Sequence, residues 1–365
     1  MENVSNITND SLSPFLPFSL SQNRRWDLVS LGEVLLRFDS GDERIHNSRN
    51  FRVWDGGGEY NVARGLAKAF RQKTAIVTAL ADNSLGRLAE DLIWQAGVDS
   101  SEIIWREADG KGENTRNGIY FIERGFGLRP PSSAFDRANT AVSQLKTGDI
   151  DWQNILKNSR WLHTGGIFVG LSETTPDVAA EAMKIARENG ATVSYDLNYR
   201  DSLWREKGGR DAANLLNREL LKNADVAFGV FDFDSKLSNY DENSFRIAAQ
   251  KMLDEFPNLK IIVSTLREVK TASKHDFSAV CFTSNGEIFK ARNYIDADVL
   301  DRVGSGDGFA SGFIYGLLNE KSASYSIECG AAHAVLTMTT PGDNSMATLP
   351  EIENLMRGDS ATAKR

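Results

Sequence analysis

Residues 301–309 read Asp-Arg-Val-Gly-Ser-Gly-Asp-Gly-Phe, and this stretch decides how the chain is interpreted. Gly304 and Gly306 let the backbone adopt positive φ values and approach a ligand closely. An apolar helix pattern follows at once, and the start of a helix offers unpaired N–H groups and a partial positive charge that suit a phosphate. Asp307 adds a carboxylate beside that anion site. A base next to a phosphate-binding loop is what phosphoryl transfer to a hydroxyl group requires.

The same stretch has a simpler structural interpretation, in which Asp307 is the N-cap of a helix that follows a tight turn. Gly-Ser-Gly-Asp is a short motif, and short glycine-rich motifs recur by chance. Taken by itself, the stretch favours the helix cap by roughly two to one. The catalytic interpretation therefore depends on the rest of the chain.

The composition of the 365-residue chain is that of an ordinary globular protein, with 41% hydrophobic and 25% charged residues. A formal net charge of -8 gives no indication of a nucleic-acid or membrane partner. Cys281 and Cys329 are too few and too far apart for a disulfide framework or a zinc site. No basic segment of a signal peptide stands at the start. We expect a cytoplasmic protein with a flexible N-terminal extension at 1–25 and a flexible tail at 358–365.

Short β-rich runs alternate with helical patterns along the chain. This alternation predicts an α/β fold with a mostly parallel sheet and helices on both faces. In such sheets, ligands bind beyond the carboxyl ends of the strands. The expected strands are Leu28–Leu31, Thr74–Leu80, Trp161–His163, Thr192–Asp196, Val226–Phe228 and Ile261–Thr265, and the expected helices lie near 84–96, 174–189, 209–223, 244–255 and 322–338.

Two regions break this alternation and predict additional strands. Glu33–Phe38 and Phe51–Trp54 are strand-like and precede the first long helix, and Asn117–Arg124 alternates again. Strands drawn from about 33–55 and 117–137 can form a small accessory sheet, which in an α/β enzyme can act as a lid over the site. The alternative is that these strands are edge hairpins of the main sheet.

A second glycine-rich stretch lies near the N-terminus. Residues 56–61 read Gly-Gly-Gly-Glu-Tyr-Asn and precede an amphipathic helix. Gly56 and Gly57 let a ligand approach the backbone, and the side-chain amide of Asn61 offers a donor and an acceptor to hydroxyl groups. Taken singly, this stretch is equally well interpreted as a flexible turn before an ordinary helix.

In this order and on these elements, the two stretches resemble the two signature motifs of the ribokinase-like (PfkB) carbohydrate kinases. The resemblance covers roughly residues 26–357, which we take as one kinase domain. It implies a three-layer αβα sandwich with a mostly parallel central sheet and a small β-sheet lid. It also implies that Asp307 is the catalytic base and that the backbone N–H groups of Gly304, Ser305 and Gly306 form an anion hole.

Within this family, four further segments are similar to 2-keto-3-deoxygluconate kinases, at residues 136–139, 195–200, 264–268 and 340–344. Two of them contain Arg137 and Arg200, permanent cations that can hold a carboxylate bidentately. A sugar acid has such a carboxylate, and a plain hexose does not. The alternative for both arginines is a salt bridge to a nearby acid such as Asp136 or Asp201.

Two aromatic residues complete the expected sugar site. Tyr120, on an expected lid strand, can cap the sugar with its ring and its hydroxyl group. Phe135 stands where related kinases can have tyrosine, so one hydroxyl contact to the substrate is lost. The substrate-binding residues implied by the resemblance are Gly56, Gly57, Asn61, Tyr120, Phe135, Arg137 and Arg200.

The resemblance implies ATP as the phosphoryl donor, with Mg²⁺ held mainly by the phosphates and water. The segment 264–268 ends an apolar strand at the edge where nucleotide binds, and with 330–344 it is expected to form the purine pocket. A monovalent cation requirement and a homodimer formed through the lid strands are left open. The expected nucleotide contacts are Ser264, Thr265, Leu266, Arg267, Gly304, Gly306 and Asn344.

One motif departs from the family pattern. The family usually carries an Asn-x-x-Glu motif after about the fifth strand, tied to magnesium and phosphate handling. Residues 229–234 read Gly-Val-Phe-Asp-Phe-Asp, so Val230 and Phe233 stand at the two positions. Either Asp232 or Asp234 supplies a substitute carboxylate through a small shift, or the metal site is weakened. No metal ligand is therefore assigned.

The sequence thus predicts ATP-dependent phosphorylation of a sugar-acid hydroxyl, most simply the 6-hydroxyl of 2-keto-3-deoxygluconate. One alternative is a PfkB kinase of a neutral sugar such as fructose or ribose, against which the two arginines argue. A second alternative is a sugar- or nucleotide-binding homologue with weak kinase activity, which the missing Asn-x-x-Glu motif motivates.

Overall fold

A mostly parallel sheet forms the centre of the computed structural model, which describes residues 24–358. Within that range it has ten strands: β1 (Leu28–Leu31), β4 (Thr74–Asp82), β5 (Ile103–Glu107), β8 (Trp161–Gly165), β9 (Thr192–Asp196), β10 (Val226–Phe228), β11 (Ile261–Thr271), β12 (Lys274–Thr283), β13 (Ile288–Lys290) and β14 (Tyr294–Asp298). Their order is β13-β12-β11-β10-β9-β8-β1-β4-β5, and β14 pairs with β12. The strands from β11 to β5 are parallel, whereas β12, β13 and β14 are antiparallel additions at one edge.

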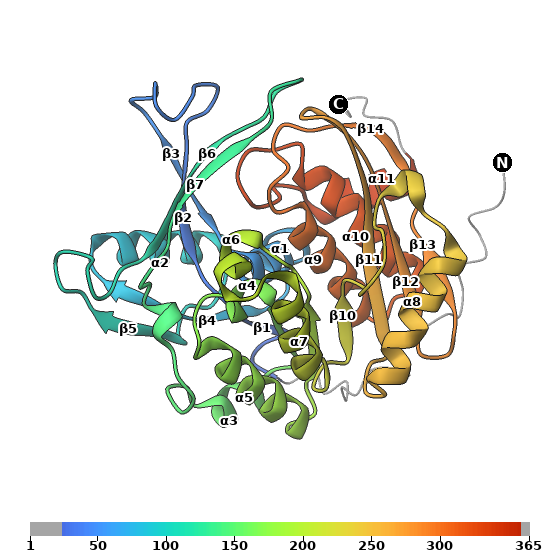
Figure 1. Ribbon diagram of the computed structural model, residues 1–365, viewed down its shortest axis with the longest axis horizontal. Coiled ribbons are helices and arrows are strands. Elements are labelled where there is room, and N and C mark those ends of the chain that lie inside the picture. Colours follow the sequence, from blue (N-terminus) through green and yellow to red (C-terminus); the bar gives the residue numbers. More distant parts are fainter. Residues whose placement is uncertain (1–23, 359–365) are drawn as a thin grey trace.

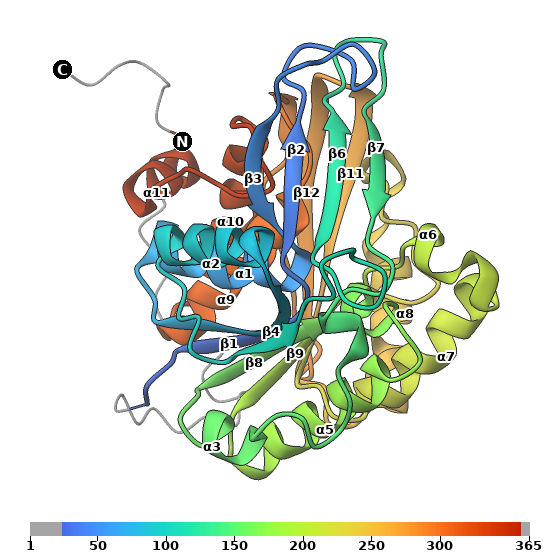
Figure 2. The ribbon, with the colours of Figure 1, turned by 90° about the vertical axis from the view of Figure 1, so that its left-hand side faces the viewer.

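Helices cover both faces of this sheet, as Figures 1 and 2 show. Each face has its own cluster of buried apolar side chains. One face carries α1 (Gly58–Phe70), α2 (Ser84–Ala96), α9 (Ser305–Leu318), α10 (Ala323–Thr337) and α11 (Leu349–Arg357), and the other carries α3 (Trp152–Leu156), α5 (Thr175–Glu188), α7 (Gly209–Leu221) and α8 (Glu242–Glu255). Short helices α4 (Gly166–Val169) and α6 (Asp201–Trp204) and 3-10 turns at Val142–Gln144, Arg205–Lys207 and Leu237–Asn239 lie in the connections.

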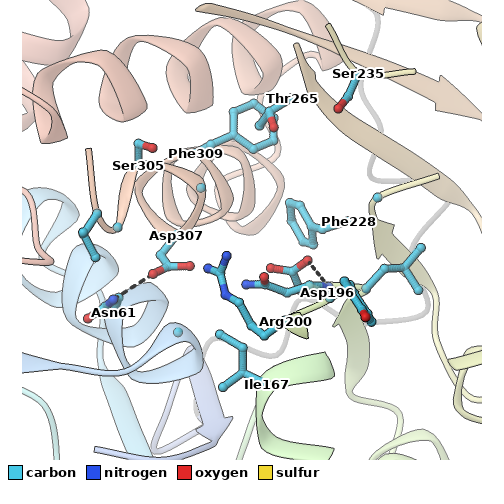
Figure 3. Close-up of a pocket in the computed structure, with 18 of the residues that line it drawn as sticks. Asn61, Ile167, Asp196, Arg200, Phe228, Ser235, Thr265, Ser305, Asp307 and Phe309 are labelled. Atoms are coloured by element: carbon cyan, nitrogen blue, oxygen red, sulfur yellow. Dashed lines mark hydrogen bonds between the residues drawn. The ribbon is translucent and has the colours of Figure 1, made fainter. Parts of the chain in front are cut away.

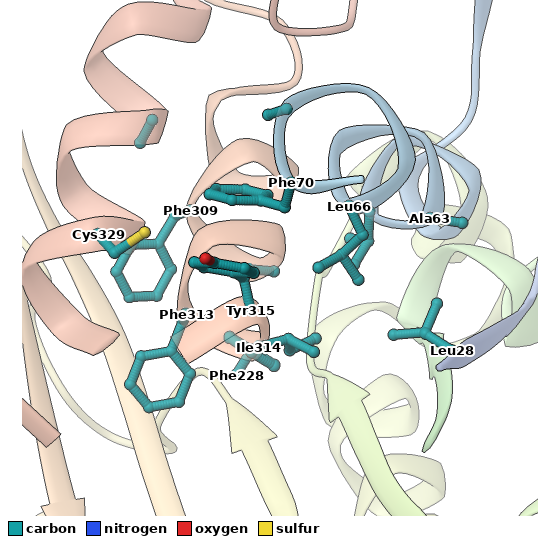
Figure 4. Close-up of a cluster of buried hydrophobic side chains, with 14 of the residues drawn as sticks. Leu28, Ala63, Leu66, Phe70, Phe228, Phe309, Phe313, Ile314, Tyr315 and Cys329 are labelled. Atoms are coloured by element: carbon teal, nitrogen blue, oxygen red, sulfur yellow. The ribbon is translucent and has the colours of Figure 1, made fainter. Parts of the chain in front are cut away.

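Helix α9 is apolar on almost every side because it is enclosed by α1, α10 and the sheet (Figure 4). The ring of Tyr315 stacks on that of Phe70 from α1, with 4.3 Å between the centroids. On the side that faces α10, glycine allows the two backbones to approach, since a Cβ atom at Gly312 would lie 2.7 Å from the carbonyl oxygen of Cys329. This packing fixes the N-terminus of α9 in position.

A second, four-stranded sheet projects from the body (Figure 2). It consists of β2 (Leu35–Asp39), β3 (Arg52–Gly56), β6 (Gly118–Glu123) and β7 (Ser132–Asp136). Strand β2 is antiparallel to β3 and parallel to β6, and β6 is antiparallel to β7, in the order β3-β2-β6-β7. The predicted accessory strands therefore form a separate lid sheet, and the alternative of edge hairpins on the main sheet is wrong.

The predicted alternation of strands and helices is confirmed, and every strand and helix expected for the main body is present. The sequence interpretation missed β5 at one edge of the sheet. It also missed β12, β13 and β14, which extend the other edge without intervening helices. Strand β12 begins with Lys-His-Asp, three polar residues that mask an otherwise apolar strand. Nearly all of the expected flexible segments at 1–25 and 358–365 lies outside the described residues. In the described part of the chain, each helix is too short or too polar to cross a membrane.

Candidate active site

A cavity of about 1150 Å³ opens where the lid meets the carboxyl ends of the parallel strands. Both glycine-rich stretches line it, through Gly57, Gly58 and Asn61 from the first and Val303–Asp307 from the second. The segments that follow β9, β10 and β11 complete the wall, and lid strands β6 and β7 contribute Tyr120 and Phe135. The cavity is larger than most sites for one small ligand, so it has room for two.

Asp307 lies in the first turn of α9, and its side chain contacts the other glycine-rich stretch (Figure 3). The Asn61 side-chain amide donates a hydrogen bond of 2.7 Å to Oδ2 of Asp307. Burial raises the pKa of Asp307 to about 7, against the effect of this hydrogen bond, and the neighbouring Asp196 adds to the rise. The N-cap of α9 is Gly304, so the interpretation of Asp307 as the N-cap is wrong. Its carboxylate is free to accept a proton near neutral pH.

The turn before Asp307 exposes backbone to the cavity. Gly304 has a φ of 77°, and a Cβ atom there would lie 1.6 Å from the carbonyl oxygen of Asp343. A Cβ atom at Gly306 would meet no heavy atom within 4 Å, because this residue faces open space. The first hydrogen bond of the helix runs from the Gly308 N–H to the Gly304 carbonyl (2.8 Å), so the N–H groups of 305–307 precede the helical pattern.

The end of β9 and the segment after it place a carboxylate, Asp196, and a guanidinium group, Arg200, on the opposite wall of the cavity. Asp196 accepts a hydrogen bond of 3.1 Å from the Asn198 N–H, and burial raises the pKa of Asp196 to about 6. The Arg200 side chain points into the cavity between Asp196 and Asp307 (Figure 3). Within residues 24–358 it forms no salt bridge, since Asp201 pairs with Arg205 instead. The alternative of a bridge from Arg200 to Asp201 is therefore wrong.

Arg137, by contrast, is already paired. Its guanidinium group donates to the buried carboxylate of Glu33, whereas Asp136 pairs with Arg116. Arg137 is therefore in a salt bridge, as the alternative interpretation held, but its partner is Glu33 and neither Asp136 nor Asp201. Of the two predicted carboxylate-binding cations, only Arg200 has its charge uncompensated by a salt bridge in the described residues.

The two aromatic lid residues stack on each other instead of acting separately. Their rings are nearly parallel, with centroids 5.0 Å apart, and Phe135 is half exposed. The hydroxyl group of Tyr120 donates to Asp343. The structure therefore corrects the expectation that this hydroxyl caps the sugar: the ring lines the cavity, and the hydroxyl is used within the protein.

Three predicted contacts lie away from the cavity wall. Gly56 is close to Asp343, because a Cβ atom at Gly56 would lie 2.3 Å from Oδ2 of Asp343. Leu266 is fully buried in the core, as the alternation of strand β11 requires. Asn344 is buried and donates to the Asp55 carbonyl (3.1 Å). The neighbouring Ser264, Thr265 and Arg267 line the cavity.

The segment that replaces the Asn-x-x-Glu motif also lines the cavity. Val230 and Phe233 are partly buried against the core. The Asp234 carboxylate accepts hydrogen bonds from the Lys236 N–H (3.0 Å) and from Asn239 (2.8 Å), so it is engaged in its own turn. In the described range, no group of three or more His, Cys, Asp or Glu residues could hold a metal ion. The donor set does not fit a protein-held Mg²⁺.

Several buried polar groups around the site were missed in the sequence. Arg37 of β2 is fully buried and donates to Asp39 (2.8 Å), Asp301 and Asp343 (2.6 Å), which ties the lid to the loop before α9 and to the loop after α10. Glu59 of α1 accepts a hydrogen bond of 3.0 Å from the Phe168 N–H, and burial raises the pKa of Glu59 to about 8. An arginine inside the apolar run Leu-Leu-Arg-Phe was the available signal for the first cluster.

Comparison with known proteins assigns the chain to a family. Residues 26–350 match the model of the pfkB family of carbohydrate kinases. The chain belongs to this family. The structure is similar to a crystal structure of 2-dehydro-3-deoxygluconokinase from Thermotoga maritima, with a TM-score of 0.81 and 32% identity, covering 91% of this chain and 99% of that one.

The curated PfkB relatives are also kinases of dehydro-deoxy sugar acids. The chain is 28% identical to a 2-dehydro-3-deoxygalactonokinase of Haloferax volcanii, over 93% of this chain and 99% of that protein. It is 27% identical to a 5-dehydro-2-deoxygluconokinase of Geobacillus kaustophilus, over 96% and 99%. The fold is shared by a protein named ribokinase II from E. coli, crystallised with ATP and Mg²⁺, at a TM-score of 0.73 and 18% identity over 91% of this chain and 99% of that one. The protein is thus a carbohydrate kinase of the PfkB family.

Proposed function

We propose that this PfkB kinase transfers the γ-phosphoryl group of ATP to the 6-hydroxyl of 2-keto-3-deoxygluconate. The observation that carries the proposal is the placement of Arg200, a cation with no salt-bridge partner in residues 24–358, on the same cavity as Asp307. A sugar acid has a carboxylate for the first residue and a distal hydroxyl for the second. The names of three relatives, each a dehydro-deoxy sugar kinase, support the same substrate class.

In this mechanism the substrate hydroxyl oxygen attacks the γ-phosphorus of ATP. A new O–P bond forms, the bond from the γ-phosphorus to the oxygen bridging the β-phosphate breaks, and ADP leaves with the bonding electron pair. Asp307 accepts the hydroxyl proton, a role for which a pKa of about 7 is well matched to neutral pH. Asn61 holds the carboxylate in place through its hydrogen bond to Oδ2.

The N–H groups of Ser305 and Gly306 are proposed to stabilise the charge on the transferring phosphoryl group. A magnesium ion that arrives with ATP would be held by the phosphates and water and would offset their negative charge. The ring of Tyr120 and the lid sheet exclude water, which otherwise competes as phosphoryl acceptor.

The test is an ADP-release assay over a matched panel of sugars. Sugar acids in the panel are 2-keto-3-deoxygluconate, 2-keto-3-deoxygalactonate and 5-keto-2-deoxygluconate, and neutral sugars are fructose and ribose. The proposal predicts a kcat/KM for 2-keto-3-deoxygluconate about 100-fold above that for fructose, because a charged hydrogen-bonded pair is worth about 1.5–3 kcal/mol. A preference for fructose or ribose would support the neutral-sugar alternative, and sugar binding without ADP release would support the binding homologue.

A further inference from the structure

Four arginines line the cavity without a salt-bridge partner in the described part of the chain: Arg200, Arg210, Arg267 and Arg302. Elsewhere, arginines with little exposed side-chain surface are neutralised by acids. Arg37 pairs with three carboxylates, and Arg64 pairs with Asp55. Uncompensated cations are therefore concentrated at the site. Arg200 is already proposed to hold the sugar carboxylate, and Arg210 lies over the ring of Tyr199, 4.2 Å from its centroid. Arg267 and Arg302 remain to be explained.

Arg267 is held at the start of α9. Its Nη2 atom donates a hydrogen bond of 2.8 Å to the Ser305 hydroxyl, which in turn donates to the Arg302 carbonyl at 3.0 Å. The Nε atom of Arg267 is buried and has no hydrogen-bond partner. The guanidinium group of Arg267 thus contacts Ser305, which lies two residues before Asp307 in α9. It keeps an N–H donor that the protein does not use.

The electrostatics at Arg267 are unfavourable without an anion. Burial and, after it, the like charges of Arg302 and Arg200 lower the pKa of Arg267 to about 10, whereas Asp307 acts in the opposite direction. Binding a polyanion beside these groups would relieve both the repulsion and the missing hydrogen bonds. The adjacent N–H groups at the start of α9 favour the same kind of ligand.

We infer that Arg267 donates hydrogen bonds to the phosphates of ATP and stabilises the phosphoryl group during its transfer, with Arg302 adding positive charge at the same end. Arg267 thereby supplies a fixed positive charge in a site where Val230 and Phe233 stand at the Asn and Glu positions of the Asn-x-x-Glu motif. The inference rests on the proposed use of ATP and makes Arg267 a catalytic residue at the phosphate end of the nucleotide instead of a purine contact. The guanidinium group of Arg267 stays protonated throughout, so the bonds formed and broken in the phosphoryl transfer are those of the proposed function.

The test measures binding, separately from turnover. Calorimetric titrations compare wild type with R267Q, using the β,γ-imido analogue of ATP and adenosine as probes, in EDTA and in Mg²⁺. We expect R267Q to bind the metal-free analogue about 10-fold more weakly or worse, as loss of a charged hydrogen bond implies, and to bind adenosine as wild type does. The gain in affinity on adding Mg²⁺ should also be larger in R267Q, because the ion then replaces part of the missing charge.

Two variants control the result. Lys270 is a cation on the same strand that pairs with Asp276 and Asp296 outside the cavity, and K270Q should bind both probes as wild type does. R267K keeps the charge without the planar fork and should retain more affinity for the analogue than R267Q. Thermal melts of each variant report whether it is folded.

Equal loss of analogue and adenosine binding in R267Q would overturn the inference, because Arg267 would then serve the purine or the fold. Unchanged analogue binding would overturn it as well, and so would R267K behaving no better than R267Q if both are folded. These outcomes are distinct from failure of the proposed function. Wild type that binds the analogue but phosphorylates no sugar acid refutes the substrate alone, whereas wild type that does not bind the analogue refutes the use of ATP and the role of Arg267 together.

Discussion

The side-chain amide of Asn61 donates a 2.7 Å hydrogen bond to Oδ2 of Asp307, which joins two glycine-rich stretches separated by 246 positions in the chain. One stretch begins α1 and the other begins α9, and the two helices pack on the same face of the sheet. The bond lowers the pKa of Asp307, while burial raises it more strongly. The carboxylate is therefore held in position while its pKa stays near neutrality.

We predict that kcat rises with pH up to about pH 7 and then levels, since Asp307 must be ionised to accept a proton and its pKa is about 7. Asn61→Ala removes a hydrogen bond to the ionised form of Asp307. The acidic limb, the part of the curve over which kcat rises with pH, should therefore move to higher pH. Asp196→Asn removes a neighbouring negative charge, so the limb should move to lower pH. The measurement is kcat against pH at saturating substrate. Shifts in the opposite directions, or none, would contradict the assignment of the limb to Asp307.

The same burial predicts a pH-dependent stability effect. The pKa of Asp307 is about 7 in the folded protein, and that of an unfolded aspartate is about 3.9. The folded state therefore holds a proton that the unfolded chain has released, and this contribution to stability is present below pH 4 and lost as the pH rises through 7. Asp307→Asn should raise Tm at pH 8, by roughly 2 °C, and have little effect at pH 4. A Tm at pH 8 that falls on substitution would contradict the burial of this charge.

The two glycines of the anion site should respond differently to alanine. At Gly304 the new Cβ atom would overlap the Asp343 carbonyl at a positive φ, so Gly304→Ala should destabilise the fold. At Gly306 it would enter open space, so Gly306→Ala should keep the wild-type Tm and lose turnover, about 10-fold or more, if the phosphoryl group lies there. Urea melts and kcat measurements separate the two. A fully active Gly306→Ala enzyme would place the phosphate elsewhere.

Arg200 should determine selectivity for acids. Arg200→Gln is predicted to lower kcat/KM for 2-keto-3-deoxygluconate by about 10- to 100-fold more than kcat/KM for fructose. Loss of the Arg200 charge raises the pKa of Asp307 for both sugars, but only the sugar acid also loses the partner of its carboxylate. Arg205→Gln is the matched control, since Arg205 is exposed and pairs with Asp201. Equal losses on both sugars would mean that Arg200 acts on the site in general.

The buried cation of the lid should matter for stability. Arg37 neutralises Asp39, Asp301 and Asp343 with a fully buried side chain. Arg37→Met would leave Asp301 and Asp343 without their cation, while Asp39 would keep Arg124 at 3.5 Å. We therefore predict a loss of about 3–5 kcal/mol in the free energy of unfolding, measured in urea. Arg44→Met, which affects a half-exposed arginine of the lid that pairs with Glu123, should cost less than about 1 kcal/mol.

Much of the main sheet was predictable because several parallel strands, such as Thr192–Asp196, are apolar runs followed by a helix with its own period. The position of Asp307 in the first turn of α9 was predictable because a glycine turn, an acid and a helix start are adjacent in the sequence. The pairing of Arg137 with Glu33 was not, since 104 positions separate them and only the lid brings them together. The same applies to Tyr120, whose hydroxyl bonds to Asp343, 223 positions away.

The most direct test of the account follows the product of 2-keto-3-deoxygluconate and ATP by ³¹P NMR, with wild type and Asp307→Asn side by side. The account predicts a phosphomonoester coupled to the two protons of C6, formed in equal amount with ADP by wild type. Asp307→Asn should bind nucleotide normally and form this product about 1,000-fold more slowly. A phosphoryl group on another carbon, or an Asp307→Asn enzyme within tenfold of wild type, would contradict the account.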